Sequence, residues 1–127
     1  ALATDQDSLS EGRKGGRLMT VHASKGLEFN TVFITGLEDD LFPHKKMDEH
    51  KMSAEESEEE RRLFYVAITR AKRRVFLTYA SFRTIFGAQQ VNAPSEFLSD
   101  IDDVLIEHME CGNDPAGFTG KVVYLDF

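Results

Sequence analysis

An arginine at the end of an apolar stripe is the first residue whose type and spacing could support chemistry. Arg70 follows Leu63 by seven residues and Val66 by four, which places it at the edge of the stripe if the segment is helical. Packing would anchor its stem there and leave the guanidinium free at the tip. A guanidinium is always charged, and its forked N–H groups fit phosphate oxygens. Phosphoryl transfer requires such a cation beside the phosphate group that is transferred. The simpler interpretation is a cation that complements a helix C-terminus, and the residues alone favour that interpretation.

A second group of polar residues surrounds a glycine earlier in the chain. Leu18–His22 is β-prone and bounded by glycine, so we predict a strand with Thr20 and His22 on one face. Gly26 and Glu28 would follow the end of that strand, where open α/β sheets bind ligands. A solvated loop glutamate and a structural histidine are the plainer alternatives for these positions.

Several common kinds of site are missing from the sequence. It has no G-x-x-x-x-G-K-[ST] motif, the loop whose backbone cradles phosphates. The four histidines are scattered and the single cysteine, Cys111, has no neighbouring partner, so we expect no metal site. No nucleophile elbow is present either. The chain by itself is therefore predicted to lack a complete active site.

The clearest predicted element is a helix over Ser57–Lys72. Ser57 and Glu60 fit a capping box, in which each side chain satisfies a free backbone N–H group. Acidic residues fill the first turn and basic residues the last, which complements the helix dipole. The basic residues are Arg70, Lys72, Arg73 and Arg74. The apolar stripe consists of Leu63, Phe64, Ala67, Ile68 and Ala71, at helical spacing.

Strands are predicted on both sides of this helix. Thr31–Thr35 is a nearly continuous apolar run, typical of a strand buried on both faces, and Val75–Tyr79 is a second β-prone run. Strand, helix and strand in this order predict a βαβ unit with a right-handed crossover. A short helix over Ser95–Leu98 and a final strand over Val122–Leu125 are also expected. The predicted fold class is α/β, with a mainly parallel sheet and flanking helices.

Composition and charge limit the classes of protein. The chain has 127 residues, of which 41% are hydrophobic and 29% charged, as in a globular domain. Its net charge of −7 argues at first against nucleic acid. However, the stretch Asp48–Glu60 holds seven acidic residues and one lysine, a charge of −6, so the remainder is close to neutral. The charge therefore does not exclude DNA.

The same composition favours a cytoplasmic protein that does not contact membranes. No apolar run approaches the ~20 residues of a membrane span, and no leader pattern is visible. The lone cysteine cannot form an internal disulfide, which fits a reducing compartment. Because the chain opens with Ala1 and not with Met, we expect it to be a piece of a longer protein.

Two long segments carry a specific resemblance. Leu18–Phe29 resembles helicase motif V of the UvrD/PcrA/Rep family, and Glu59–Lys72 resembles motif VI. Val32–Glu38 and Leu41–His44 between them also match, and the resemblance extends over about Leu18–Leu98. It implies the C-terminal half of the second RecA-like motor domain of a DNA helicase, which hydrolyses ATP with Mg²⁺ in the full-length protein.

The resemblance also implies roles for individual residues around ATP. Arg70 matches the arginine of motif VI that reaches the γ-phosphate as an arginine finger. Glu28 matches the glutamate that accepts a hydrogen bond from the ribose, and Gly26 allows close approach of the backbone. Lys25 faces either ATP or DNA. The family binds ATP mainly through an N-terminal motor domain that this chain lacks, so the chain alone is predicted to be inactive.

The DNA partner and the domain limits follow from the same resemblance. Thr20 and His22 match motif V positions near the backbone of single-stranded DNA. The implied activity is 3′-to-5′ translocation on single-stranded DNA with unwinding of duplex DNA. Residues 1–16 would be a flexible segment leading from an inserted domain, 17–101 the motor-domain half, and 102–127 a C-terminal tail.

Two alternatives remain at this point. A subunit of a RecB-like or AddA-like helicase-nuclease carries similar motifs. A non-catalytic interaction module derived from a helicase is the other possibility, since the tail matches nothing. A P-loop upstream in the parent gene would support a working helicase.

Overall fold

The computed structural model describes residues 15–44, 52–110 and 120–126, and for residues 110 and 120–126 the backbone alone. The predicted flexible segment therefore lies almost wholly outside the described residues, as do residues 48–51 at the start of the acidic stretch. The elements are η1 (His22–Ser24), β1 (Phe29–Ile34), α1 (Ala54–Thr69), β2 (Ala71–Ala80), β3 (Phe82–Ile85), β4 (Ala88–Val91), η2 (Glu96–Asp100), η3 (Asp103–Leu105), β5 (Glu107–Glu110) and β6 (Gly120–Asp126).

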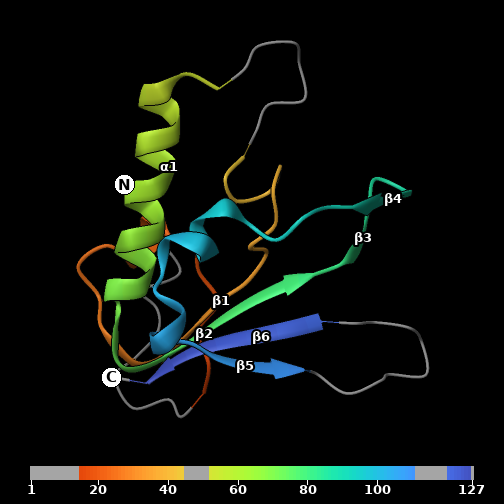
Figure 1. Ribbon diagram of the computed structural model, residues 1–127. Helices are drawn as coiled ribbons and strands as arrows, with labels where there is room; N and C mark the ends of the chain where they lie inside the picture. The colour runs from red at the N-terminus through yellow and green to blue at the C-terminus, as the bar shows by residue number, and fades with distance from the viewer. Residues whose placement is uncertain (1–14, 45–51, 111–119, 127) are drawn as a thin grey trace.

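The main sheet has four strands in the order β1-β2-β6-β5 (Figure 1). β1 pairs in parallel with β2, with Val32 opposite Val75 and Ile34 opposite Leu77, and α1 connects them. The α/β class and the predicted βαβ unit are confirmed. The expectation of a mainly parallel sheet is wrong for the described residues, because β6 pairs antiparallel with both β2 and β5. The segment predicted as a tail thus contributes two strands to this sheet.

Helix α1 begins one turn earlier than predicted. Ser53 is its N-cap, and the capping box forms between Ser53 and Glu56, whose side chains each accept from the other's backbone N–H at 3.1 and 3.0 Å. Ser57 lies inside the helix and donates its N–H to the Ser53 carbonyl. The predicted box at Ser57 is therefore wrong. The sequence repeats the S-x-x-E pattern, and the earlier copy leads into a further turn of good helix formers.

Helix α1 also ends earlier than predicted, at Thr69. Arg70 is its C-cap, and Ala71 already pairs with Phe29 as the first residue of β2. Lys72 and its two basic neighbours therefore lie on a strand, and the predicted cation cluster in the last helical turn is wrong. The backbone groups that leave the helix are satisfied by pairing with β1, so the strand can begin here without leaving N–H or C=O groups unpaired.

The predicted strand over Leu18–His22 is absent. Thr20 and Val21 lead into the single turn η1, and the side chain of Leu18 is fully exposed. A strand needs a neighbour for its N–H and C=O groups, and in the part of the chain that the structure describes β1 pairs with β2 only. The short helix predicted near Ser95 is present as η2, with Ser95 as its N-cap.

The core lies between the sheet and the layer formed by α1 and η2 (Figure 1). From α1, Phe64 and Ala67 are buried against Val75 and Leu77 of β2, as the predicted stripe requires. Phe97 of η2 is fully buried, and its ring stacks on Phe64 with 5.3 Å between centroids. Burial of such aromatic side chains is a large hydrophobic contribution for a domain of this size.

Polar contacts reinforce the same layer from outside. Arg61 of α1 lies 2.9 Å from Asp100 of η2, and its guanidinium carbon is 5.8 Å from the centroid of the Phe97 ring. The opposite face of the sheet carries Phe33 and Phe76, which are stacked across the parallel pair at 4.5 Å. In the described residues, no helix is long and apolar enough to span a membrane.

The contrast between two phenylalanines tests this arrangement. Phe97→Ala should lower the free energy of unfolding by about 3–5 kcal/mol, because it opens a cavity in the core. Phe86→Ala, at a fully exposed position, should change it by less than about 0.5 kcal/mol. Urea unfolding followed by circular dichroism measures both. Similar losses for the two variants would contradict the placement of Phe97.

Candidate functional site

Arg70 joins the end of α1 to the loop before β1. Its backbone carbonyl accepts from Phe29 N at 2.8 Å, and its Nη1 donates to the Leu27 carbonyl at 3.1 Å. Nε donates to the Val66 carbonyl at 3.0 Å, and Nη2 to Thr69 Oγ1 at 3.3 Å. These bonds hold the guanidinium in one orientation at a half-buried position.

The guanidinium of Arg70 still has donors to offer. It carries five N–H groups, and three of them are used by the contacts to Val66, Leu27 and Thr69. One N–H on each Nη therefore has no acceptor among the described residues. Two donors on neighbouring nitrogens are what a phosphate group binds. The bond to the Val66 carbonyl also satisfies a helix C-terminus, so the simpler interpretation of Arg70 as a helix-end cation holds in part.

Glu28 is fixed beside Arg70 through its two neighbours. Leu27 and Phe29 are both hydrogen bonded to Arg70, so the intervening Glu28 lies at the same corner of the molecule, with an exposed side chain. Gly26 precedes it with φ of +82°, a conformation that favours glycine. A Cβ at Gly26 would meet nothing within 4 Å, so open space adjoins this backbone. Lys25 is exposed next to it.

The structure corrects the location expected for this corner. Glu28 and Arg70 stand immediately before β1 and β2, so they lie at the amino-terminal edge of the parallel pair. The prediction placed Glu28 after a strand, at a carboxyl-terminal edge, and that strand is not formed. The corner is built by hydrogen bonds from Arg70 and not by the sheet edge alone.

The prediction that Thr20 and His22 share the face of a strand is wrong, because His22 begins η1 and Thr20 lies just before it. Thr20 Oγ1 accepts from Ala23 N at 3.1 Å, and Ser24 Oγ donates to the Val21 carbonyl at 2.6 Å. Thr20 and His22 are both exposed, and Ser24 is buried. The bond to Ala23 uses an oxygen lone pair, so the Thr20 hydroxyl hydrogen has no acceptor among the residues that the structure describes.

Two aromatic residues of the matching segments, Phe42 and Tyr65, differ in exposure. Phe42 packs in the core, with ring centroids 6.1 Å from Phe64 and 5.6 Å from Phe97. Tyr65 is 69% exposed on α1. No group of histidine, cysteine and acidic residues suited to a metal ion occurs within the described residues.

A hairpin that sequence reasoning missed presents an exposed aromatic residue. β3 and β4 pair antiparallel as a separate two-stranded sheet beyond the end of β2 (Figure 1). Phe86 and Gly87 form the two-residue turn with φ of +50° and +75°, and Phe86 is fully exposed. Left-handed backbone costs a bulky residue about 1–2 kcal/mol, and glycine or asparagine is usual there. In the sequence, the dipeptide Phe86-Gly87 is the signal from which this turn could have been predicted.

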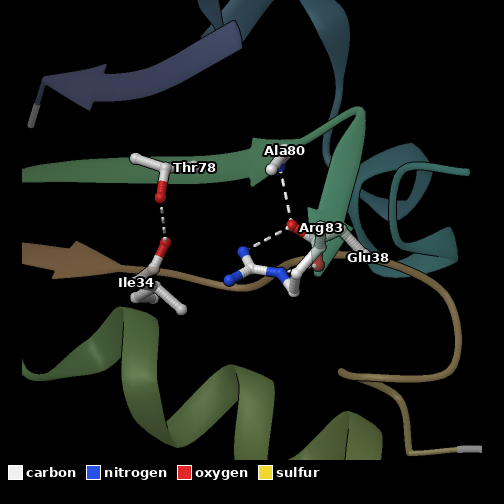
Figure 2. A network of polar contacts seen from close by, with 5 residues as sticks. All are labelled: Ile34, Glu38, Thr78, Ala80 and Arg83. Atoms are coloured by element: carbon white, nitrogen blue, oxygen red, sulfur yellow. Dashed lines mark hydrogen bonds and ion pairs between the residues drawn. The ribbon is translucent and has the colours of Figure 1, made fainter. Parts of the chain in front are cut away.

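Glu38 is the second residue that sequence reasoning left without a role. It is fully buried in the loop after β1 and accepts three hydrogen bonds (Figure 2). Ala80 N and Arg83 Nη2 donate to Oε1 at 2.7 and 2.8 Å, and Arg83 Nε donates to Oε2 at 2.9 Å. Burial by itself would raise the pKa of Glu38. The hydrogen bonds and the charge of Arg83 outweigh burial, so the pKa lies below its ordinary value.

Comparison with known proteins identifies the family. Residues 1–82 match the family model described as the UvrD-like helicase C-terminal domain. The chain is 47% identical over 115 residues to the ATP-dependent DNA helicase PcrA of Bacillus subtilis, and 45% identical over 116 residues to that of Staphylococcus aureus strain Mu50. These alignments cover 86% and 88% of this chain but 15% of each relative.

The chain therefore belongs to the UvrD-like helicase family, as a C-terminal domain segment. The resemblance inferred from motifs V and VI is confirmed. The chain spans about 15% of the length of these relatives. The roles predicted for Arg70, Glu28, Gly26, Lys25, Thr20 and His22 remain predictions.

The buried Glu38 predicts a defined response of stability to pH. At about pH 7, Glu38→Gln should be less stable than wild type by about 1.5–3 kcal/mol, the range for a hydrogen bond to a charged group. The folded-state pKa is lowered, so the extra stability of wild type is present above the unfolded-state value of about 4.3. It should decline as the pH falls through the lower folded-state pKa. The difference between the two proteins should therefore shrink in acid.

Urea unfolding across this pH range provides the measurement. Glu59→Gln is the matched control, because Glu59 pairs with Arg62 at 3.3 Å on the surface, where such pairs contribute at most about 1 kcal/mol. A stability difference for Glu38→Gln that does not change with pH would show that its charge is not what stabilises the fold.

Proposed function

We propose that this chain is the C-terminal part of the second RecA-like motor domain of an ATP-dependent DNA helicase. The observation that carries this proposal is the oriented guanidinium of Arg70, which keeps two N–H donors available beside Glu28. The helicase would move 3′-to-5′ on single-stranded DNA and unwind duplex DNA. The relatives' names describe ATP-dependent DNA helicases and not helicase-nucleases, which favours this function over the RecB-like or AddA-like alternative.

Arg70 would act on ATP held mainly by the N-terminal motor domain of the same protein. That domain would contribute the P-loop, whose motif is absent from this sequence, and the Mg²⁺ ligands. Arg70 would place its two remaining N–H groups on the γ-phosphate and stabilise the charge of the transition state. Its contacts to Leu27, Val66 and Thr69 hold the group in position before ATP arrives, so little reorganisation accompanies the reaction.

The neighbouring residues would complete this wall of the nucleotide site. Glu28 can accept a hydrogen bond from a ribose hydroxyl, since its side chain is exposed beside Arg70. The open space at Gly26 allows the nucleotide to approach the backbone. Lys25 can supply a further positive charge to phosphate of either ATP or DNA.

DNA would be contacted at η1 and at the hairpin. Thr20 has a free hydroxyl hydrogen and His22 an exposed ring, and both can reach a phosphate of single-stranded DNA. Phe86 at the tip of the β3–β4 turn exposes a flat ring, and aromatic side chains of this kind stack on bases or insert between base pairs. We propose that Phe86 stacks on the terminal base pair where the strands separate.

A substitution at Arg70 in the full-length protein tests the nucleotide role. Arg70→Ala should slow ATP hydrolysis stimulated by single-stranded DNA by ~10³-fold or more, the scale for loss of an arginine finger. Arg70→Lys should restore little, because a point charge cannot replace the planar fork. Single-turnover hydrolysis with saturating DNA separates the chemical step from binding.

Lys72→Ala provides the control, since Lys72 is an exposed cation two residues along the chain. Its hydrolysis rate should match that of wild type. Equal, mild effects of Arg70→Ala and Lys72→Ala would reduce Arg70 to a helix-end cation and remove the basis of the proposal.

A substitution at the hairpin tip tests the unwinding role. Phe86→Ala should reduce the rate of duplex unwinding by about tenfold or more, since base–aromatic stacking contributes about 1–3 kcal/mol. Its effect on ATP hydrolysis stimulated by single-stranded DNA should be much smaller. Phe86→Tyr and Phe86→Trp should unwind nearly as well as wild type, because both keep a flat ring. Normal unwinding by Phe86→Ala would exclude the hairpin from strand separation.

A further inference from the structure

The hairpin β3–β4 needs support from outside itself if it is to hold Phe86 against DNA. It forms its own two-stranded sheet, beyond the end of β2. An isolated two-stranded hairpin is only marginally stable in water. A hairpin that resists a base pair must therefore be fastened where it joins the rest of the domain.

We propose that Glu38 is a positioning residue that fixes the direction in which the hairpin presents Phe86 to the duplex. The inference rests on the proposed function, because it assigns Glu38 to the strand-separating step. Glu38 would not touch DNA or ATP, and would act through Arg83 and the backbone at the base of the hairpin.

The side chain of Glu38 holds the strand that enters the hairpin. Ala80 is the last residue of β2, and its N–H donates to Oε1 of Glu38 (Figure 2). Arg83 lies on β3, and its Nε and Nη2 bind the two oxygens of the same carboxylate. One buried carboxylate therefore spans the bend between β2 and β3. A bidentate pair fixes orientation as well as distance.

The backbone around Glu38 holds the strand that leaves the hairpin. Asp39 N donates to the Ala93 carbonyl at 2.9 Å, and Ser95 N donates to the Leu37 carbonyl at 2.8 Å. Between them, Glu38 forms an isolated antiparallel bridge with Pro94. The loop 37–39 thus holds both ends of the hairpin, one through a side chain and one through main-chain bonds.

The chemistry of the contact favours positioning over simple stabilisation. Taking a carboxylate out of water is expensive, and an apolar pair of similar volume often stabilises a fold as well or better. What the ion pair adds is direction, since the fork of Arg83 matches only one placement of the carboxylate. Arg83 remains 37% exposed, so the partner of the buried charge extends to the surface of the hairpin.

The same strand connects this support to the nucleotide side of the domain. β2 begins directly after Arg70 and ends at Ala80, the residue bound by Glu38. β1 runs beside it in parallel, from Phe29, bonded to Arg70, to Ile34, four residues before Glu38. A parallel pair of this length, about 20 Å along β1 at ~3.3 Å per residue, places Arg70 and the hairpin at opposite ends of one rigid unit.

Conservative substitutions in the full-length helicase test the proposal. Glu38→Gln keeps the volume and an acceptor for Ala80 N but loses the charge and the fork. Arg83→Lys keeps the charge and loses the fork. Both should lower the rate of unwinding of a tailed duplex by about tenfold or more, as small misplacements of a working group do. Hydrolysis and translocation rates on single-stranded DNA should stay within about twofold of wild type, since neither residue lies at Arg70.

Glu59→Gln and Arg62→Lys are the matched controls, because they make the same changes in an exposed ion pair on α1. Both should behave as wild type in every assay. All assays are run below the melting temperature of each variant. A role in stability alone predicts that Glu38→Gln lowers hydrolysis, translocation and unwinding by the same factor, and this result would overturn the proposal. Unwinding that equals wild type in both Glu38→Gln and Arg83→Lys would also overturn it.

Phe86→Ala, run in parallel, separates failure of this inference from failure of the proposed function. If Phe86→Ala loses unwinding while Glu38→Gln and Arg83→Lys retain it, the hairpin separates strands but Glu38 does not position it. If Phe86→Ala unwinds normally, the proposed role of the hairpin itself is wrong, and the inference falls with it.

Discussion

The hydrogen bonds of Arg70 are the constraint on which the arrangement of this domain depends. The Arg70 carbonyl receives Phe29 N, and its guanidinium binds the Leu27 carbonyl. These two contacts fix the end of α1 against the start of β1, where Phe29 pairs with Ala71 and where the parallel pairing of β1 with β2 begins. The same contacts orient the guanidinium and place Glu28 beside it. One residue therefore determines both where the helix gives way to the strand and which side chain adjoins its guanidinium.

Much of the fold could be predicted because local pattern and burial agree. The stripe that includes Phe64 and Ala67 predicted the buried face of α1, and two apolar runs predicted β1 and β2. The errors arise where two local signals compete or where the deciding partner is distant. Two S-x-x-E patterns compete for the start of α1, and pairing of Ala71 with Phe29 decides its end. The antiparallel place of β6 could not be read from composition, because strand order depends on contacts between distant segments.

The residues of the candidate site could likewise be predicted only in part from the sequence. Motif resemblance singled out Arg70 and Glu28, and the hydrogen bonds that bring them to one corner required the structure. Glu38 and Phe86 had no role before the structure, because one is defined by burial and the other by exposure. In the sequence Glu38 is one of many acidic residues. Only the fold separates it from the solvated glutamates of α1, whose charges are paired with arginines at the surface or exposed to water.

The turn at Phe86 and the charge at Glu38 both run against what stability alone would favour. A phenylalanine at φ of +50° with a fully exposed ring combines backbone strain with apolar surface in water. A fully buried carboxylate must recover its lost hydration through each of its three hydrogen bonds. Such features persist where activity requires them, because stability and function commonly conflict at working sites. Arg83 lies on the strand that leads to Phe86 and is bound to Glu38. The strained turn and the buried charge are therefore connected through one hairpin strand. Under the proposed function, the hairpin keeps a strained aromatic tip for contact with DNA, and the buried charge of Glu38 holds that tip in place.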